Sequence, residues 1–80
     1  MEVEDLKKVL LKGKNIDILL YLAEYSPKAS RADITERFGK PALSGLKELK
    51  RLRLVEEENG FLQLTSKGIF QVEGLMAMVG

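Results

Sequence analysis

The sequence predicts a mainly α-helical domain that carries one small β-hairpin. Apolar residues recur at three- and four-residue intervals along most of the chain, which is the period of an amphipathic helix. The dipeptide Asn59-Gly60 lies between two short extended segments, and this is the strongest local signal for a two-residue hairpin turn. A chain of 80 residues has room for one domain with one small core.

Two helices are predicted before the first proline. Residues 1–12 place apolar side chains on one side at helical spacing, and Gly13 is a suitable stop. The next helix can be capped by Asn15 and ends at Pro27. Because this segment is apolar on most sides, we expect it to be the central helix of the core. Its apolar residues are Ile16, Ile18, Leu19, Leu20, Leu22 and Ala23.

A third, shorter helix is predicted in the segment "SRADITERFG". Ser30 stands three residues before Asp33, as in a capping box, and Gly39 is a suitable stop. The helical period turns Ile34 and Phe38 towards the core.

The fourth predicted helix, residues 41–52, has one basic exposed side. It begins at Pro41, which suits a first helical turn because its missing N–H group has no partner there. Helical geometry turns Leu43, Leu46 and Leu49 towards the core. The opposite side carries Ser44, Lys47, Glu48 and Arg51. Gly45 lies beside that exposed side, so either something approaches the backbone closely there or the glycine is merely tolerated.

The Asn59-Gly60 turn fixes the register of the predicted hairpin. The expected pairs are Glu58 with Phe61, Glu57 with Leu62, Glu56 with Gln63 and Val55 with Leu64. Strand alternation puts Val55, Leu62 and Leu64 on the inner side. Phe61 is then on the outer side, where it covers the neighbouring strand or contacts a protein or a nucleic acid.

A final helix is predicted over residues 66–79, and it is more apolar than the end of a monomer of 80 residues requires. If residues 15–64 form the core with its hairpin, both terminal helices keep apolar stripes. These stripes are Val3, Leu6, Leu10, Ile69, Val72, Met76 and Val79. We expect part of this surface to pack within the monomer and part to form a homodimer with two-fold symmetry.

The composition excludes several functional classes. The chain has no cysteine and no histidine, so it can form neither a disulfide nor a zinc site with nitrogen and sulfur ligands. Its carboxylates are dispersed and it has no glycine-rich phosphate loop, so we expect no enzyme, no metal and no cofactor. No apolar run approaches the roughly 18 residues of a membrane span, and the N-terminus lacks a signal-peptide pattern. We therefore expect no membrane partner and a cytoplasmic location.

The net charge of +1 hides an uneven distribution along the chain. Residues 28–53 hold eight basic and three acidic side chains, whereas residues 1–27 hold four and five, and residues 54–80 hold one and four. Such a local positive block indicates an anion-binding surface. The alternative is an ordinary solvated helix surface.

A short helix, a tight turn and a second helix with a basic exposed side form a helix-turn-helix, in which the second helix can enter a DNA major groove. The hairpin that follows makes this a winged version. The segment "KPALSGLKELKRLRLVEEENGFLQLTSKG" resembles the winged helix-turn-helix core of bacterial and archaeal regulators of the ArsR and MarR type. In those families a stretch similar to "PALSxxLKxLxxxxLV" forms the recognition helix, and "LTxxG" closes the wing. The resemblance covers about residues 15–70.

The resemblance implies a single winged helix-turn-helix domain over residues 1–80 that binds double-stranded DNA. Its N-terminal helix would be residues 1–12, its core with the wing residues 15–64, and its C-terminal helix residues 66–79. The residues implied to lie near base edges are Pro41, Ala42, Ser44, Gly45 and Glu48. Those implied to lie nearer phosphates are Lys40, Lys47 and Arg51.

The chain departs from the family pattern at several positions. Gly45 and Leu46 stand where many relatives have arginine and histidine, and Arg53 replaces the glycine that is usual before "LV". The wing tip carries Glu56 and Glu58 where lysine or arginine would normally meet the DNA backbone, and these glutamates would repel phosphates.

The expected function is therefore sequence-specific DNA binding by a dimeric transcriptional regulator, with residues 41–52 as the recognition helix. The alternative is a winged-helix module that binds another protein, because a fold does not determine its function. The acidic hairpin favours this alternative, and the positive block favours DNA.

Overall fold

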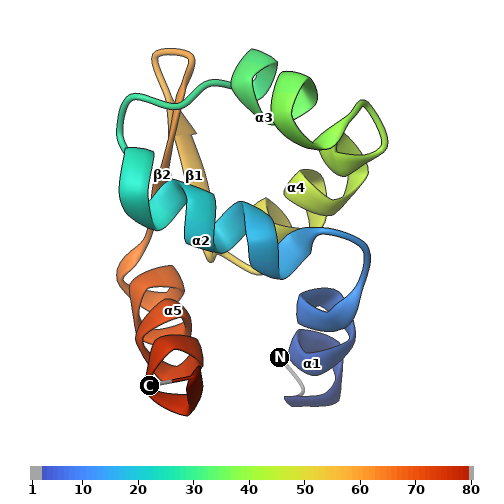
Figure 1. Cartoon of the computed structure of the whole chain (residues 1–80), viewed down its shortest axis with the longest axis vertical. Helices are drawn as coiled ribbons and strands as arrows, with labels where there is room; N and C mark the ends of the chain where they lie inside the picture. Colours follow the sequence, from blue (N-terminus) through green and yellow to red (C-terminus); the bar gives the residue numbers. More distant parts are fainter. Residues whose placement is uncertain (1–2, 80) are drawn as a thin grey trace.

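A computed structural model describes the backbone of residues 3–79 and the side chains of residues 6–78. Within these residues the protein is mainly helical, with five helices and one two-stranded antiparallel hairpin (Figure 1). The elements are α1 (Val3–Leu11), α2 (Asn15–Tyr25), α3 (Arg31–Phe38), α4 (Ala42–Arg51), β1 (Val55–Glu58), β2 (Phe61–Leu64) and α5 (Ser66–Val79).

Helix α2 crosses the middle of the molecule, as its apolar composition predicts. Helices α3 and α4 and the hairpin lie on one side of it, and α1 and α5 lie on the other (Figure 1). Its side chains Ile18, Leu19 and Leu22 are completely buried and meet apolar residues from the other elements. The rest of the buried apolar cluster is Val9, Ala29, Ile34, Ala42, Leu46, Leu49, Leu52, Leu54, Val55, Leu62 and Val72.

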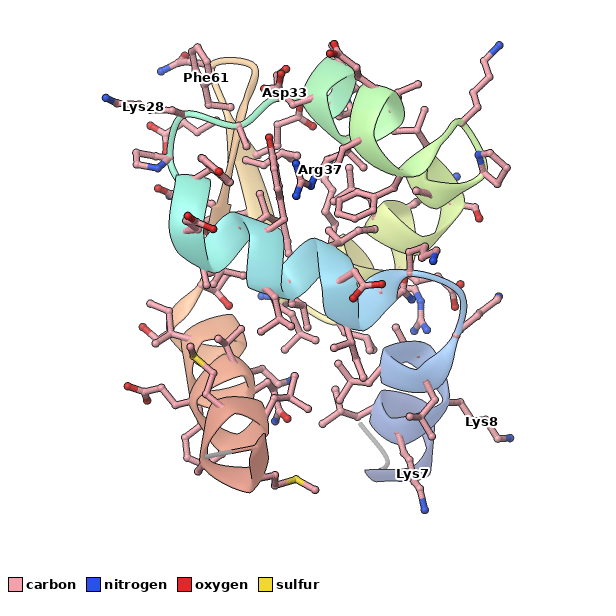
Figure 2. The ribbon with its side chains drawn as sticks, in the orientation of Figure 1. Lys7, Lys8, Lys28, Asp33, Arg37 and Phe61 are labelled. Carbon is pink, nitrogen blue, oxygen red and sulfur yellow. The ribbon has the colours of Figure 1, made fainter. Side chains whose placement is uncertain are left out.

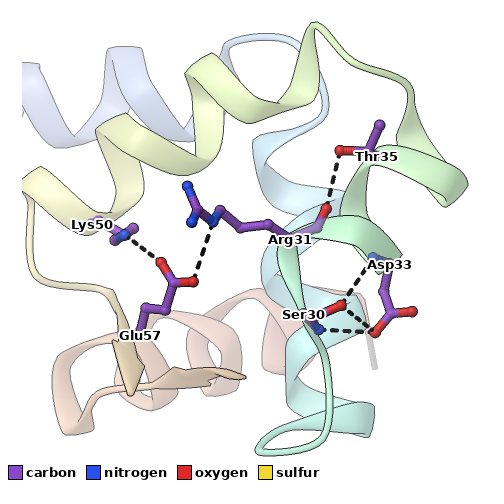
Figure 3. Close-up of polar contacts among 6 residues, drawn as sticks. All are labelled: Ser30, Arg31, Asp33, Thr35, Lys50 and Glu57. Atoms are coloured by element: carbon purple, nitrogen blue, oxygen red, sulfur yellow. Dashed lines mark hydrogen bonds and ion pairs between the residues drawn. The ribbon is translucent and has the colours of Figure 1, made fainter. Parts of the chain in front are cut away.

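The predicted limits of α3 are confirmed. Ser30 caps the helix, because its Oγ accepts a hydrogen bond from the backbone N–H of Asp33 while the Asp33 carboxylate accepts one from the backbone N–H of Ser30 (Figure 3). The helix ends at Gly39, whose φ of 90° is readily adopted only by glycine.

The prediction that Asn15 caps α2 is wrong. The capping position belongs to Lys14, which makes no side-chain cap, and Asn15 is the first residue of the helix. Its side chain is only 2% exposed and donates a hydrogen bond from Nδ2 to the carbonyl oxygen of Val9 at 2.6 Å. A buried amide must find such a partner, and here it connects α2 to the end of α1.

The predicted register of the hairpin is confirmed at all four pairs. Asn59 and Gly60 have φ values of 54° and 85°, as the two positions of a type I′ turn require. The hairpin is joined to the loop before α3, because Leu62 donates a backbone hydrogen bond to Ala29 at 2.7 Å. Arg53, just before β1, has a φ of 63°, which explains why glycine would fit this position well.

The predicted apolar stripes on the terminal helices are divided between the core of the monomer and its surface. Val72 belongs to the monomer core, and Leu6 and Leu10 pack partly against it. Ile69 and Met76 are exposed. The side chains of Val3 and Val79, which complete the predicted stripes, lie outside the described residues. No helix in the described part of the chain is both long enough and apolar enough to span a bilayer.

Candidate nucleic-acid interface

Helix α4 presents the two sides that its sequence predicts. Leu46 and Leu49 are buried against the core, whereas Ser44, Lys47 and Arg51 are exposed. The helix is supported from behind by α2 and α3, and β1 follows it directly. Its exposed side is therefore a polar, cationic surface held on a rigid base.

Two of the residues that sequence reasoning assigned to this surface are buried. Ala42 faces the core, and Gly45 faces the side chain of Asn15. A Cβ atom at Gly45 would overlap Asn15 Oδ1. The close approach considered for Gly45 thus comes from within the chain, and placing this glycine beside the exposed stripe was wrong. Neither Ala42 nor Gly45 offers a side chain to a partner.

Two polar residues of α4, Ser44 and Glu48, already have contacts within the chain. Ser44 is exposed, and its Oγ donates a hydrogen bond to the carbonyl oxygen of Pro41 at 3.1 Å. The hydroxyl oxygen can still accept a bond from a partner. Glu48 is only partly exposed, and its Oε1 lies 2.9 Å from Lys12 Nζ in the turn between α1 and α2. Glu48 is therefore partly neutralised.

The cations expected near phosphates are available. Lys40 and Pro41 are exposed in the turn between α3 and α4, and Lys47 and Arg51 are exposed on α4. Within residues 6–78, Lys40, Lys47 and Arg51 form no ion pair. Three full positive charges are thus left to face an anion.

Two other cations of the positive block are used inside the fold. The carboxylate of Glu57 on β1 lies 2.8 Å from Lys50 Nζ and 3.2 Å from Arg31 Nε (Figure 3). The hydrogen bond from Lys50, together with the charges of Lys50 and Arg31, holds the pKa of Glu57 below its ordinary value, although partial burial acts in the opposite direction. Sequence reasoning missed this contact, because it joins three separate elements.

Arg37 is also turned away from α4. Its guanidinium carbon lies 5.1 Å from the centre of the Tyr21 ring and 6.0 Å from that of Phe38, which is a cation–π arrangement between α2 and α3 (Figure 2). Part of the positive charge counted along residues 28–53 is therefore engaged in contacts within the chain, although Arg31 and Arg37 remain exposed.

The hairpin presents acidic groups. Glu56 and Glu58 are exposed, and Glu56 accepts a hydrogen bond from Gln63 Nε2 at 2.6 Å. Phe61 is 49% exposed near the tip, where it borders a shallow pocket with Pro27. The ring is therefore only half covered, which leaves it free to make a further contact.

Among the described residues, no group of three or more histidine, cysteine, aspartate or glutamate side chains could hold a metal ion. Comparisons of the chain with family models, with curated proteins and with solved structures gave no match.

Proposed function

We propose that this protein is a winged helix-turn-helix regulator of transcription that binds double-stranded DNA and has no enzymatic activity. Helices α3 and α4 form the helix-turn-helix, α4 enters the major groove, and the β1–β2 hairpin is the wing. The observation that carries the proposal is the exposed side of α4. Lys47 and Arg51 form no ion pair within residues 6–78 and stand beside Ser44 on a helix whose back is buried.

The residues of this surface have separate roles. Lys40, Lys47 and Arg51 contact phosphates, which supplies affinity without sequence preference. Ser44 lies nearer the base edges, with Pro41 beside it, and Glu48 can accept a hydrogen bond from cytosine. Ala42 and Gly45 contribute by letting α4 pack closely on the core.

The direct test is a salt titration of binding to a random duplex. If four to six phosphates are neutralised, the logarithm of the affinity should fall with the logarithm of the salt concentration at a slope of about −4 to −5. Lys47→Ala or Arg51→Ala should weaken all sequences by similar factors, whereas Ser44→Ala should change the preference between sites. A wild-type protein that binds no duplex at low salt would rule out the proposal.

The proposed regulator is a homodimer that pairs through its terminal helices. Helices α1 and α5 border an open cavity of about 460 Å³ on the side of α2 opposite α4. Its apolar lining is Leu6, Leu10, Leu11, Ile16, Leu75 and Met78. Two copies related by a two-fold axis here would form a dimer with two α4 helices, one for each of two half-sites on DNA.

The acidic hairpin favours a second candidate function, a module that binds another protein. Exposed Glu56 and Glu58 would be repelled by phosphates, and half-exposed Phe61 is an aromatic residue of the kind enriched in protein interfaces. The same salt titration separates the two candidates, because a protein module of this small net charge would show no duplex binding with a slope of that size.

A further inference from the structure

A cavity of about 320 Å³ lies between the turn that joins α1 to α2 and the first turns of α4. Lys12 and Lys14 of the α1–α2 turn form one wall, and Pro41 and Ser44 form part of the other. No carboxylate lines this cavity. Two lysines from a segment that is acidic in sequence therefore stand beside the exposed side of α4.

Two contacts hold the α1–α2 turn against α4, one buried and one at the surface. Asn15 is buried, bonds to the carbonyl oxygen of Val9, and fills the space left by the missing side chain of Gly45. On the outer side, Lys12 is paired with Glu48. These two contacts join the α1–α2 turn to α4, so its lysines have a defined position relative to that helix.

The two lysines differ in what they already contact. Lys12 is bonded to Glu48, whereas Lys14 is exposed and forms no ion pair within residues 6–78. A phosphate of a strand lying along Ser44 would be close to Lys14, because both residues line the same cavity. Lys14 is therefore placed to meet the DNA backbone beside α4.

We propose that the α1–α2 turn is a second phosphate-contacting element of the DNA interface, in which Lys14 binds the backbone directly and Lys12 is restrained by Glu48. The proposal rests on the proposed function, since it assumes that α4 faces DNA. The two lysines add positive charge beside α4, whereas Arg31, Arg37 and Lys50 make contacts within the chain.

The test compares Lys14→Ala with Lys8→Ala in the salt titration on a random duplex. Lys8 is a matched control, because it projects from α1 away from α4 (Figure 2). Lys14→Ala should weaken binding of all sequences by a similar factor and should reduce the salt slope by about one. Lys8→Ala should leave the slope unchanged. Circular dichroism checks that each variant keeps its helices.

The outcomes separate the two proposals. If Lys47→Ala weakens binding but Lys14→Ala behaves like Lys8→Ala, the α1–α2 turn has no phosphate contact and this inference is overturned, while the proposed function stands. If the wild type binds no duplex, both are overturned.

Lys12 gives a second measurement. In the wild type, Lys12→Ala should reduce the slope by less than Lys14→Ala does, because Glu48 restrains the lysine. In a Glu48→Gln background the ammonium group is released, and Lys12→Ala should then cost a full unit of slope. Equal effects of Lys12→Ala in both backgrounds would contradict the restraint by Glu48.

Discussion

Gly45 shows how a single residue joins two elements of this protein. A glycine in the interior of a helix is about 1 kcal/mol less favourable than alanine. Here the missing side chain leaves room for Asn15, whose amide is buried between α1 and α4. The local loss of helix stability is offset by a polar contact that fixes the α1–α2 turn against α4.

We therefore expect Gly45→Ala to destabilise the protein although alanine favours helices. The new methyl group would displace Asn15 and break its bond to Val9, and an unsatisfied buried amide costs about 1–3 kcal/mol. After a gain of about 1 kcal/mol in helix propensity, the net loss should be up to about 2 kcal/mol. Urea unfolding measures it.

The matched control is Gly74→Ala. Gly74 is exposed in α5 and lines the cavity beside α1, and within the monomer a Cβ atom there meets nothing within 4 Å, so the comparison is made at concentrations where the protein is monomeric. This variant should be more stable than the wild type by up to about 1 kcal/mol. A Gly45→Ala protein that also gains stability would show that Asn15 relaxes without loss.

At the scale of elements, Glu57 connects the hairpin to both α3 and α4. Its carboxylate is 17% exposed and lies between Lys50 of α4 and Arg31 of α3. Because each contact crosses from one element to another, these ion pairs restrain the hairpin relative to α3 and α4. Side chains alternate along a strand, so the neighbouring Glu56 and Glu58 face outwards.

The lowered pKa of Glu57 predicts a loss of stability in acid. Ionised Glu57 stabilises the fold fully above its ordinary pKa of about 4.5, and this contribution disappears as the pH falls through the lower folded pKa. Glu57→Gln should cost roughly 0.5–1.5 kcal/mol at pH 7 and should lose less further stability than the wild type between pH 5 and pH 3.

Urea midpoints across this pH range test the prediction. Glu58→Gln is the control, because Glu58 is exposed and forms no ion pair within residues 6–78. An acid transition that is the same in Glu57→Gln and in the wild type would mean that the ion pairs contribute no net stability.

Local signals in the sequence were sufficient for the order of the elements and for most of their limits, although the cap of α2 was placed one residue too late. The capping box of α3 and the Asn59-Gly60 turn lie within a few residues of the structure that they determine, so both were predicted with the correct bounds or register. The contacts that define the candidate interface join residues far apart. Lys12 and Glu48 are 36 positions apart, and no pattern in either segment predicts their ion pair.

The position of the positive surface likewise depends on contacts between residues that are far apart in the sequence. Counting along the chain assigned the positive surface to residues 28–53, yet Arg31, Arg37 and Lys50 serve contacts inside the fold. The α1–α2 turn supplies Lys12 and Lys14 instead. A pair of lysines around a glycine was visible in the sequence, but only the packing of Asn15 against Gly45 places it beside α4.

At the scale of the whole molecule, the position of the proposed dimer interface depends on which side of α5 remains apolar and uncovered. On the last helix, the sequence favoured a stripe through Ile69, Val72, Met76 and Val79. The structure uses Val72 in the core, and the cavity beside α1 is lined by other α5 residues, among them Leu75 and Met78. We therefore place the proposed interface at the cavity.

Two methionines of α5 provide a matched test of this placement. Met78 lines the cavity and is 85% exposed, whereas Met76 is 60% exposed and does not line it. Met78→Glu should bring an unpaired charge into the dimer interface and shift sedimentation towards the monomer, while Met76→Glu should leave the dimer intact. Because both side chains are exposed in the monomer, neither change should reduce the helical signal, which excludes unfolding as the cause. Dissociation by Met76→Glu alone would move the interface to the stripe that the sequence favoured, and a monomeric wild type would remove the dimer from the proposed function.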